Sequence, residues 1–452
     1  MSAIPKKQVL LLKPEHQETL AAIEIQHARR REAHLERARG YPGQLWVPPL
    51  VLAVLCLAAV SPAAFSADKP KGPEISRVIA KEMTAAQKAM QASQWSEALK
   101  NLEAAETKSP LTTFDKKTID DFKGFVNVKL NNMKAAQAAY EAAIATGGYT
   151  AEEAGKTYRM LFRLAAGNQN YPKAIEFGKQ AVEAGVTNND DLVVMSQLYY
   201  LEKDCKNSNL WGDKAIAAAR KSGEAPKENL YLFKLKCADD ASDTPGKIAA
   251  LYELVRLTKK TEYWNNLIRL ERQDERDDHN TLMIYRVMYD TKSMNADTDY
   301  IEMAQLLGDA GLPGEAQSVL ETVMASTLMK EEHRERTTRL LNSIKTRAET
   351  DKKGLAQLDA EAAKNPAGDL SVKTGEVHYG FGDYAAAITV INSGLQKGQI
   401  KHIDEAYVYL GRSQVALKST ADAKKAFAQL KGAAGASPRV VKLWELYAET
   451  IS

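Results

Sequence analysis

The residues nearest to a catalytic motif are Gly155–Thr157 (Gly-Lys-Thr), which resemble the end of a phosphate-binding loop. Such a loop needs another glycine five residues before Gly155, because its backbone amides must wrap around the phosphates. Thr150 occupies that position, and Gly148 lies two residues too far away. We therefore predict that this segment begins a helix and that the chain binds no nucleotide.

The histidines and acidic residues give no local signal for a metal site. After residue 66 the chain has His279, His333, His378 and His402, none of them four residues from another, and HExxH does not occur. His378 is more typical of a packed core residue than of a ligand. The acidic clusters lack the central glycine of a calcium loop, and GxSxG is absent. The sequence thus predicts no catalytic, cofactor or metal site and no small-molecule substrate.

Composition also excludes several partner classes. The chain has 452 residues, of which 44% are hydrophobic and 26% charged, as in an ordinary folded protein. The net charge of +3 belongs to residues 1–45, so the remainder is neutral. A neutral chain has no overall field that attracts nucleic acid or an anionic membrane.

The amino-terminal residues predict export. A basic leader (1–45) precedes an apolar run from Leu50 to Val60, and small residues at Ala64 and Ser66 follow. These are the parts of a secretory signal, with cleavage expected after Ser66 and a periplasmic location for the mature chain. The alternative is that residues 46–66 remain as an inner-membrane anchor, which would be the only contact with the membrane. We expect 1–45 to be disordered and 67–78 to be a linker.

In the remaining chain, one sequence pattern recurs about every 34–39 residues between 79 and 437. Its clearest copy is 374–391, and Pro438 begins a final segment, 438–452, that is expected to be a capping helix. A period of this length is typical of helical hairpins that stack because none can bury its apolar face alone. The predicted fold is all-α: about ten hairpins in a right-handed superhelical solenoid with a concave groove.

The repeat resembles the tetratricopeptide (TPR) motif, which has a small residue at position 8, an aromatic at 17, alanine at 20 and a large apolar residue at 24. In the second copy Gly124, Ala136 and Tyr140 fill positions 8, 20 and 24, whereas in the third copy Gly178 departs from the motif at position 24. Weaker copies follow, with these residues at position 20: Ser208, Lys247, Thr281, Ala316 and Gly354.

The TPR resemblance implies that positions 2, 5, 6, 9, 12 and 13 of each first helix line the groove. Aromatic and arginine side chains on such a surface are the types that anchor protein partners. The residues expected there are Arg159, Met160, Arg163, Val194, Tyr200, Tyr379, Tyr409 and Arg412.

Cys205 and Cys237 lie 32 residues apart, close to one repeat, and the register places both toward the same edge of the solenoid. In an oxidising compartment a disulfide between adjacent repeats would form. Two buried free thiols fit the sequence equally well. No CxxC occurs, so neither a redox nor a metal role is predicted.

Four sequence segments that are more specific than the TPR motif resemble the periplasmic TPR proteins that accompany TonB–ExbB–ExbD systems: Ala225–Tyr231, Leu251–Leu257, Thr261–Trp264 and Met303–Pro313. The resemblance implies a non-enzymatic scaffold that touches TonB-, ExbB- or ExbD-type components in energy-dependent uptake. A TPR component of cell-envelope assembly or polysaccharide export is the alternative.

Overall fold

The computed structural model describes residues 74–451, and every regular element in that range is helical. The expected leader and signal segment (1–66) and the first part of the linker lie outside the described residues. Within 74–451, the structure contains no helix with the length and apolar character needed to cross a membrane. The helices are α3 (Ala80–Gln91), α4 (Trp95–Glu106), α5 (Thr113–Lys129), α6 (Met133–Ala145), α7 (Ala151–Gly167), α8 (Tyr171–Glu183), α9 (Asn189–Leu201), α10 (Cys205–Lys221), α11 (Glu228–Asp240), α12 (Thr244–Thr258), α13 (Thr261–Arg272), α14 (Asp278–Asp290), α15 (Asp297–Asp309), α16 (Pro313–Ala325), α17 (Glu331–Lys364), α18 (Asp369–Gly380), α19 (Tyr384–Lys397), α20 (Ile403–Ala416), α21 (Thr420–Ala428), the 3-10 turn η2 (Gln429–Gly432) and α22 (Pro438–Thr450).

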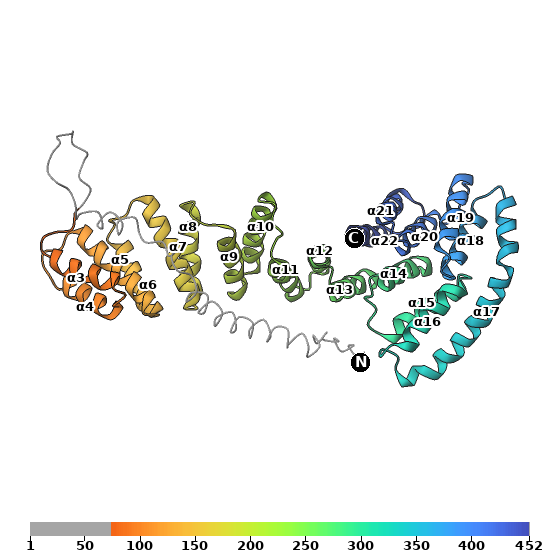
Figure 1. The fold of residues 1–452 in the computed structure, drawn as a ribbon, viewed down its shortest axis with the longest axis horizontal. Helices are drawn as coiled ribbons and strands as arrows, with labels where there is room; N and C mark the ends of the chain where they lie inside the picture. Colours follow the sequence, from red (N-terminus) through yellow and green to blue (C-terminus); the bar gives the residue numbers. More distant parts are fainter. Residues whose placement is uncertain (1–73, 452) are drawn as a thin grey trace, which may run out of the picture. The chain divides into compact units, whose positions relative to one another are not determined.

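Consecutive helices pack as hairpins, from α3 with α4 onward, and neighbouring hairpins stack (Figure 1). The first helices α5, α7 and α9 each begin with a capping box, in which Thr112, Thr150 and Asn188 bind the backbone of the third helical residue. Thr150 therefore starts α7, and Gly155 lies in its second turn, where an added Cβ would be 2.4 Å from that of Ala184. Gly155 is a packing residue, in agreement with the prediction that a helix starts here.

Small residues let the two helices of a hairpin approach closely, as the repeat pattern predicts. A Cβ on Gly124 would lie 2.7 Å from the Tyr140 ring, and one on Gly411 would lie 2.5 Å from the Phe427 ring. Real Cβ contacts are not that short, so only glycine fits. The fourth hairpin uses two serines instead: Ser196 and Ser208 each donate a hydrogen bond to the other's carbonyl, at 2.9 and 3.0 Å.

The third repeat shows why Gly178 departs from the pattern. Phe162 occupies position 8, and a Cβ on Gly178 would lie 3.0 Å from its ring and 2.3 Å from the sulfur of Met195. Phe162 and Met195 are fully buried. This repeat has the large residue at position 8 and the small one at position 24, the reverse of the motif. The two helices of the hairpin therefore still pack closely.

The repeat that carries Gly354 differs from the expected pattern. Instead of a hairpin, the structure has one continuous helix, α17, of 34 residues. Residues 346–353 contain no proline, glycine or asparagine that would end a helix, and the lone Gly354 costs only about 1 kcal/mol relative to alanine. The middle of α17 borders a cleft of about 440 Å³ that is lined by Gly311, Leu312, Thr350, Asp351, Gly354, Leu358, Lys373 and Val377.

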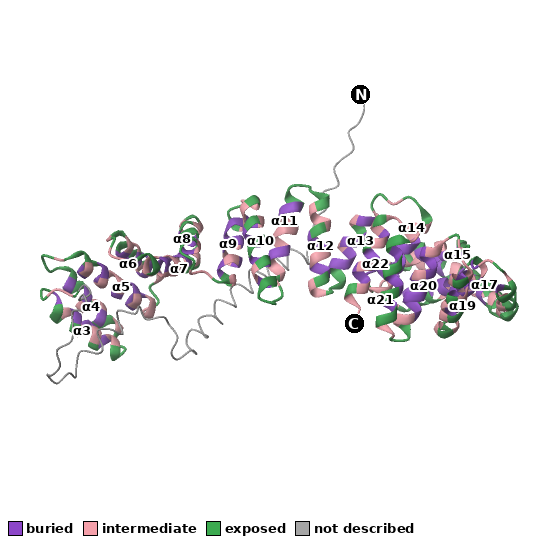
Figure 2. Cartoon of the chain, turned by 90° about the horizontal axis from the view of Figure 1, so that it is seen from above, coloured by how far each residue is buried: buried purple, intermediate pink, exposed green. Residues whose placement is uncertain are grey.

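The last repeats fold back onto earlier ones, so that α22 contacts α12 and α14 as well as α21 (Figure 1). The Ser437 backbone donates a 2.9 Å hydrogen bond to the Asn280 side chain, and Arg439 donates one of 3.0 Å to the Glu271 carbonyl. Buried residues of α14, α20 and α22 belong to one core, and Figure 2 colours the ribbon purple where residues are buried. We call this contact of α20 and α22 with α12, α14 and α16 the closure.

Candidate functional site

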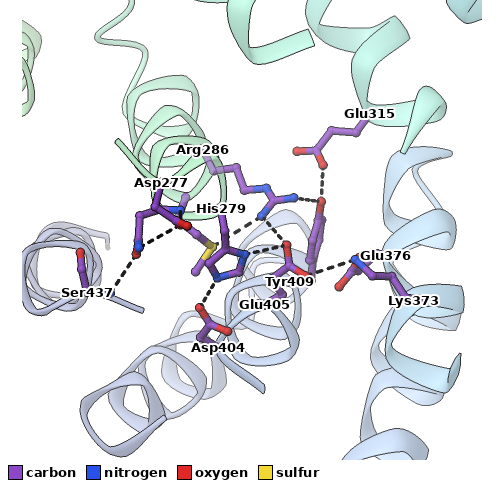
Figure 3. A network of polar contacts seen from close by, with 12 residues as sticks. Asp277, His279, Arg286, Glu315, Lys373, Glu376, Asp404, Glu405, Tyr409 and Ser437 are labelled. Atoms are coloured by element: carbon purple, nitrogen blue, oxygen red, sulfur yellow. Dashed lines mark hydrogen bonds and ion pairs between the residues drawn. The ribbon is translucent and has the colours of Figure 1, made fainter. Parts of the chain in front are cut away.

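A network of buried charged side chains holds the closure together (Figure 3). Arg286 of α14 is completely buried, and it donates a 2.5 Å hydrogen bond to the hydroxyl of Tyr409 on α20. That hydroxyl donates a bond of 2.5 Å to Glu315 on α16. The Arg286 guanidinium also lies over the Tyr409 ring, 4.5 Å from its centroid. Three helices are thus joined through one phenol.

Arg412 supplies the second buried cation of the network. It binds both oxygens of Asp290 on α14, at 2.8 and 3.0 Å, and Glu315 at 2.6 Å. Its guanidinium stacks 4.5 Å from the ring centroid of Tyr379. Burial opposes ionisation of Glu315, but Arg412 and Arg286 outweigh that effect and hold the pKa of Glu315 below its usual value.

Two carboxylates, those of Glu376 and Glu405, share Lys373 at the α18 side of the network. Lys373 binds Glu376 at 2.9 Å and Glu405 at 3.2 Å, and Arg286 lies 3.5 Å from Glu405. Burial, reinforced by the negative charge of Glu405, raises the pKa of Glu376 to about 7 although Lys373 opposes the shift. Glu376 is therefore partly protonated near neutral pH.

The network corrects the expectation that Tyr409 and Arg412 line an open groove. The Tyr409 side chain is fully buried, that of Arg412 is 1% exposed, and Tyr379 packs against both. The reason is the closure: α14 and α16 cover the face that a more open solenoid would expose. These three residues hold the fold together and cannot anchor a partner while the closure is intact.

The corresponding face of the earlier repeats is open. Arg163 of α7 stands at position 9 of its repeat, as Arg412 does in the last one, yet the Arg163 side chain is 54% exposed. Arg159 is 34% exposed. Both arginines bind the buried Asp191 of α9, Arg159 through Nε at 2.7 Å and Arg163 through Nε at 3.0 Å and Nη2 at 2.5 Å. One carboxylate thus serves two guanidinium groups, which leaves one positive charge in excess.

Apolar side chains accompany these arginines. Met160, Val194 and Tyr200 are each partly exposed, as expected for a groove surface. The Tyr200 ring stacks on Phe233 of α11, with centroids 4.7 Å apart. Phe233 was not among the predicted groove residues, although it occupies position 6 of its repeat, as Met160 and Val194 do in theirs. We call the inner-surface residues Arg159, Met160, Arg163, Val194, Tyr200 and Phe233 the open face.

The two cysteines belong to repeats four and five, which also carry Val194, Tyr200 and Phe233 of the open face. Cys205 is the first residue of α10, Cys237 is near the end of α11, and the structure joins them in a disulfide with Cα atoms 5.6 Å apart. Adjacent repeats four and five are thus covalently linked.

The solved structures that are similar to this chain include TPR proteins. No protein-family model and no curated protein matches the sequence. Solved structures similar to this chain include a tetratricopeptide repeat protein from Parabacteroides merdae, with 11% identity over 82% of this chain and 99% of that one and a TM-score of 0.28. A second is Naa15/Naa10 bound to HypK-THB, with 13% identity over 78% of this chain and 57% of that one and a TM-score of 0.38. A third is a complex of the TPR2AB domain of yeast Sti1 with pHSP90, with 14% identity over 59% of this chain and 98% of that one and a TM-score of 0.32.

At these scores the likenesses carry no information about function. The paired helices and the small-to-large packing at positions 8 and 24 establish the fold directly. Residues 74–451 form an all-α, TPR-like solenoid.

Proposed function

We propose that this chain is a non-enzymatic scaffold that binds a protein partner on the open face. The observation that carries the proposal is the difference between two arginines at the same repeat position. Arg412 is 1% exposed and saturated by two carboxylates, whereas Arg163 is 54% exposed and shares one carboxylate with Arg159. The solenoid has closed one part of its inner surface and left the other accessible.

The chemistry of the open face suits an extended protein segment. Tyr200 and Phe233 form a stacked aromatic pair, and Met160 and Val194 add apolar contact area. The exposed guanidinium of Arg163 can donate hydrogen bonds to a carboxylate of the partner. Aromatic and arginine side chains provide much of the binding energy at protein interfaces. The expected partner segment therefore carries apolar side chains and at least one acidic residue.

We further propose that the scaffold works in the periplasm as an accessory to a TonB–ExbB–ExbD system. The signal-like segment at 46–66 and the four sequence segments between Ala225 and Pro313 support this assignment. The Cys205–Cys237 disulfide supports it as well, because disulfides persist in oxidising compartments. Fractionation of cells should place the protein in the periplasm with an amino terminus near Ala67.

The binding test is a pull-down from envelope extract, with identification of the recovered proteins and titration of the purified partner. Arg163→Glu and Tyr200→Ala should each weaken binding at least about tenfold, since both remove an interface anchor. Leu210→Ala is the matched control: Leu210 is 50% exposed on the second helix α10, outside the open face. Helicity and melting temperature are measured for every variant.

Two results would decide against parts of the proposal. Unchanged affinity of both open-face variants with intact helicity would show that the partner binds elsewhere. Recovery of polysaccharide-export components in place of TonB, ExbB or ExbD would leave the scaffold function standing and replace the system.

A further inference from the structure

We propose that His279, His402 and Asp404 form a binding site for a divalent transition-metal ion at the junction of α14 and α20. One ligand atom from each residue lies within 4.8 Å of the other two. His279 is the second residue of α14, and His402 and Asp404 flank the first residue of α20. Figure 3 shows His279 and Asp404 facing each other across this junction.

Two imidazoles and one carboxylate converge here. His279 Nε2 lies 2.6 Å from Asp404 Oδ2, and the rings of His279 and His402 have centroids 4.7 Å apart and planes tilted by 32°. Two imidazole nitrogens with one carboxylate oxygen are a ligand set that zinc and neighbouring first-row metals accept, with a fourth position left for water. Since zinc–ligand bonds of about 2.0–2.2 Å place tetrahedral ligand atoms about 3.3–3.5 Å apart, small side-chain rotations complete the site.

An ion pair between His279 and Asp404 explains only part of the cluster. Asp404 is fully buried, yet its Oδ1 has no hydrogen-bond partner among the described residues. The buried Nδ1 of His402 is likewise without a partner in residues 74–451. Buried polar atoms left unpaired are costly, by about 1–3 kcal/mol each. A bound metal ion would satisfy ligand atoms that the protein itself leaves open.

The backbone beside the cluster leaves room for the carboxylate. Gly435, with φ of +113°, lies so close to Asp404 that an added Cβ would be 2.4 Å from Oδ1. Only glycine fits both the dihedral angle and the approach. His279 is 18% exposed, so an ion can enter from solvent.

A second layer of contacts fits the same assignment. His279 Nδ1 faces Glu405 Oε1 at 3.6 Å, and Glu405 is held by Lys373 and Arg286. A metal-bound histidine commonly donates its other N–H to a carboxylate, which fixes the ring and strengthens the ligand. The two nearby helix amino termini oppose a cation, and the paired negative charges of Asp404 and Glu405 offset that repulsion.

A metal here would link α14 to α20 at the rim of the closure. Local sequence patterns do not reveal such a site, because His279 and Asp404 are 125 positions apart. The ligand class is a first-row divalent ion, and Zn²⁺ is the probe.

The experiment titrates Zn²⁺ into chelator-treated full-length protein against a chromophoric competitor and follows the melting temperature. One Zn²⁺ per chain should bind, and the melting temperature should rise with Zn²⁺ concentration. His402→Ala and Asp404→Asn should weaken binding by more than about 100-fold, and Glu405→Gln by about 10- to 100-fold. His333→Ala, which removes a histidine that pairs with Asp297 at 2.8 Å outside the cluster, should bind as the wild type does.

His402 is the decisive position: its Nδ1 has no hydrogen-bond partner within the described residues, and its ring contacts that of His279, so its replacement removes no hydrogen bond of Nδ1 from the metal-free fold. His402→Gln repeats the test if the alanine variant loses helicity. Visible absorption of the Co²⁺ complex should show tetrahedral coordination in the wild type and in His333→Ala but not in the His402 variants. Failure of the wild type to bind Zn²⁺ at micromolar concentration, or equal affinity in the folded His402 variants, would overturn the proposal.

Discussion

Arg286 and Tyr409 are 123 positions apart, yet the arginine donates a 2.5 Å hydrogen bond to the tyrosine hydroxyl inside a site that water does not reach. The same hydroxyl donates to Glu315, so it connects a buried cation to a buried anion. Removing one member of such a network exposes the others to the full cost of burial without a partner.

The Tyr409 hydroxyl should therefore contribute strongly to stability. Tyr409→Phe keeps the ring but leaves Glu315 and Arg286 each short of one bond, and it should lower the free energy of unfolding by about 1–3 kcal/mol. Urea unfolding followed by circular dichroism measures the loss. Tyr379→Phe is the control, since the Tyr379 hydroxyl forms no hydrogen bond with the residues that the structure describes. Equal effects of the two variants would contradict the role given to the Tyr409 hydroxyl.

Truncation of the two arginines at position 9 should lower stability by very different amounts. Arg412→Ala leaves Asp290 and Glu315 buried without this cation, and it should lower the free energy of unfolding by about 3–5 kcal/mol. Arg163→Ala leaves Asp191 bound to Arg159 and should cost no more than about 1 kcal/mol. Thermal and urea unfolding of the two variants side by side provides the measurement. Similar losses in both would mean that Arg412 is not covered in solution.

Glu376 should make the closure weaker as pH rises. Its pKa is raised from 4.5 to about 7, so the folded state holds a proton that the unfolded chain has lost in this window. The resulting stability is complete below about pH 4.5 and disappears as pH rises through 7. Lys373 on its own helix, Glu405 on α20 and Arg286 on α14 are the charged groups that face it.

Glu376→Gln isolates this contribution, because the amide has nearly the same shape and does not titrate. Unfolding free energies are compared between pH 5 and pH 8 in the presence of a chelator. The wild type should lose stability relative to Glu376→Gln across this range. A constant difference between the two proteins would show that Glu376 does not bind the proton.

Two glycines in helices should give stability changes of opposite sign. Gly411→Ala forces a Cβ into the Phe427 ring and should cost about 1–3 kcal/mol. Gly354→Ala, in the exposed middle of α17 with nothing within 4 Å of the added Cβ, should stabilise the protein by up to about 1 kcal/mol. Melting temperatures of both variants test the pair, and destabilisation by Gly354→Ala would indicate that α17 is not a continuous helix there.

Features that depend on neighbours within one repeat could be predicted from the amino-acid sequence alone. Gly124 packs against Tyr140, and Thr150 caps the start of α7. In both cases the residues involved are close along the chain, so their types were enough to predict the contact. The period of the pattern then required the hairpins to stack. The prediction of a hairpin was wrong for α17, because local residue preferences there differ only weakly between a hairpin turn and a continuous helix.

Which parts of the inner surface are exposed depends on contacts between distant repeats. Arg163 and Arg412 have the same residue type and the same repeat position, so no local pattern separates them. The difference arises because the last repeats fold back after the continuous helix α17, so that α22 meets α12 and α14; this arrangement buries Arg412 and brings His402 to His279. Contacts between repeats that are far apart in the chain are a property of the whole array, and no single repeat encodes them.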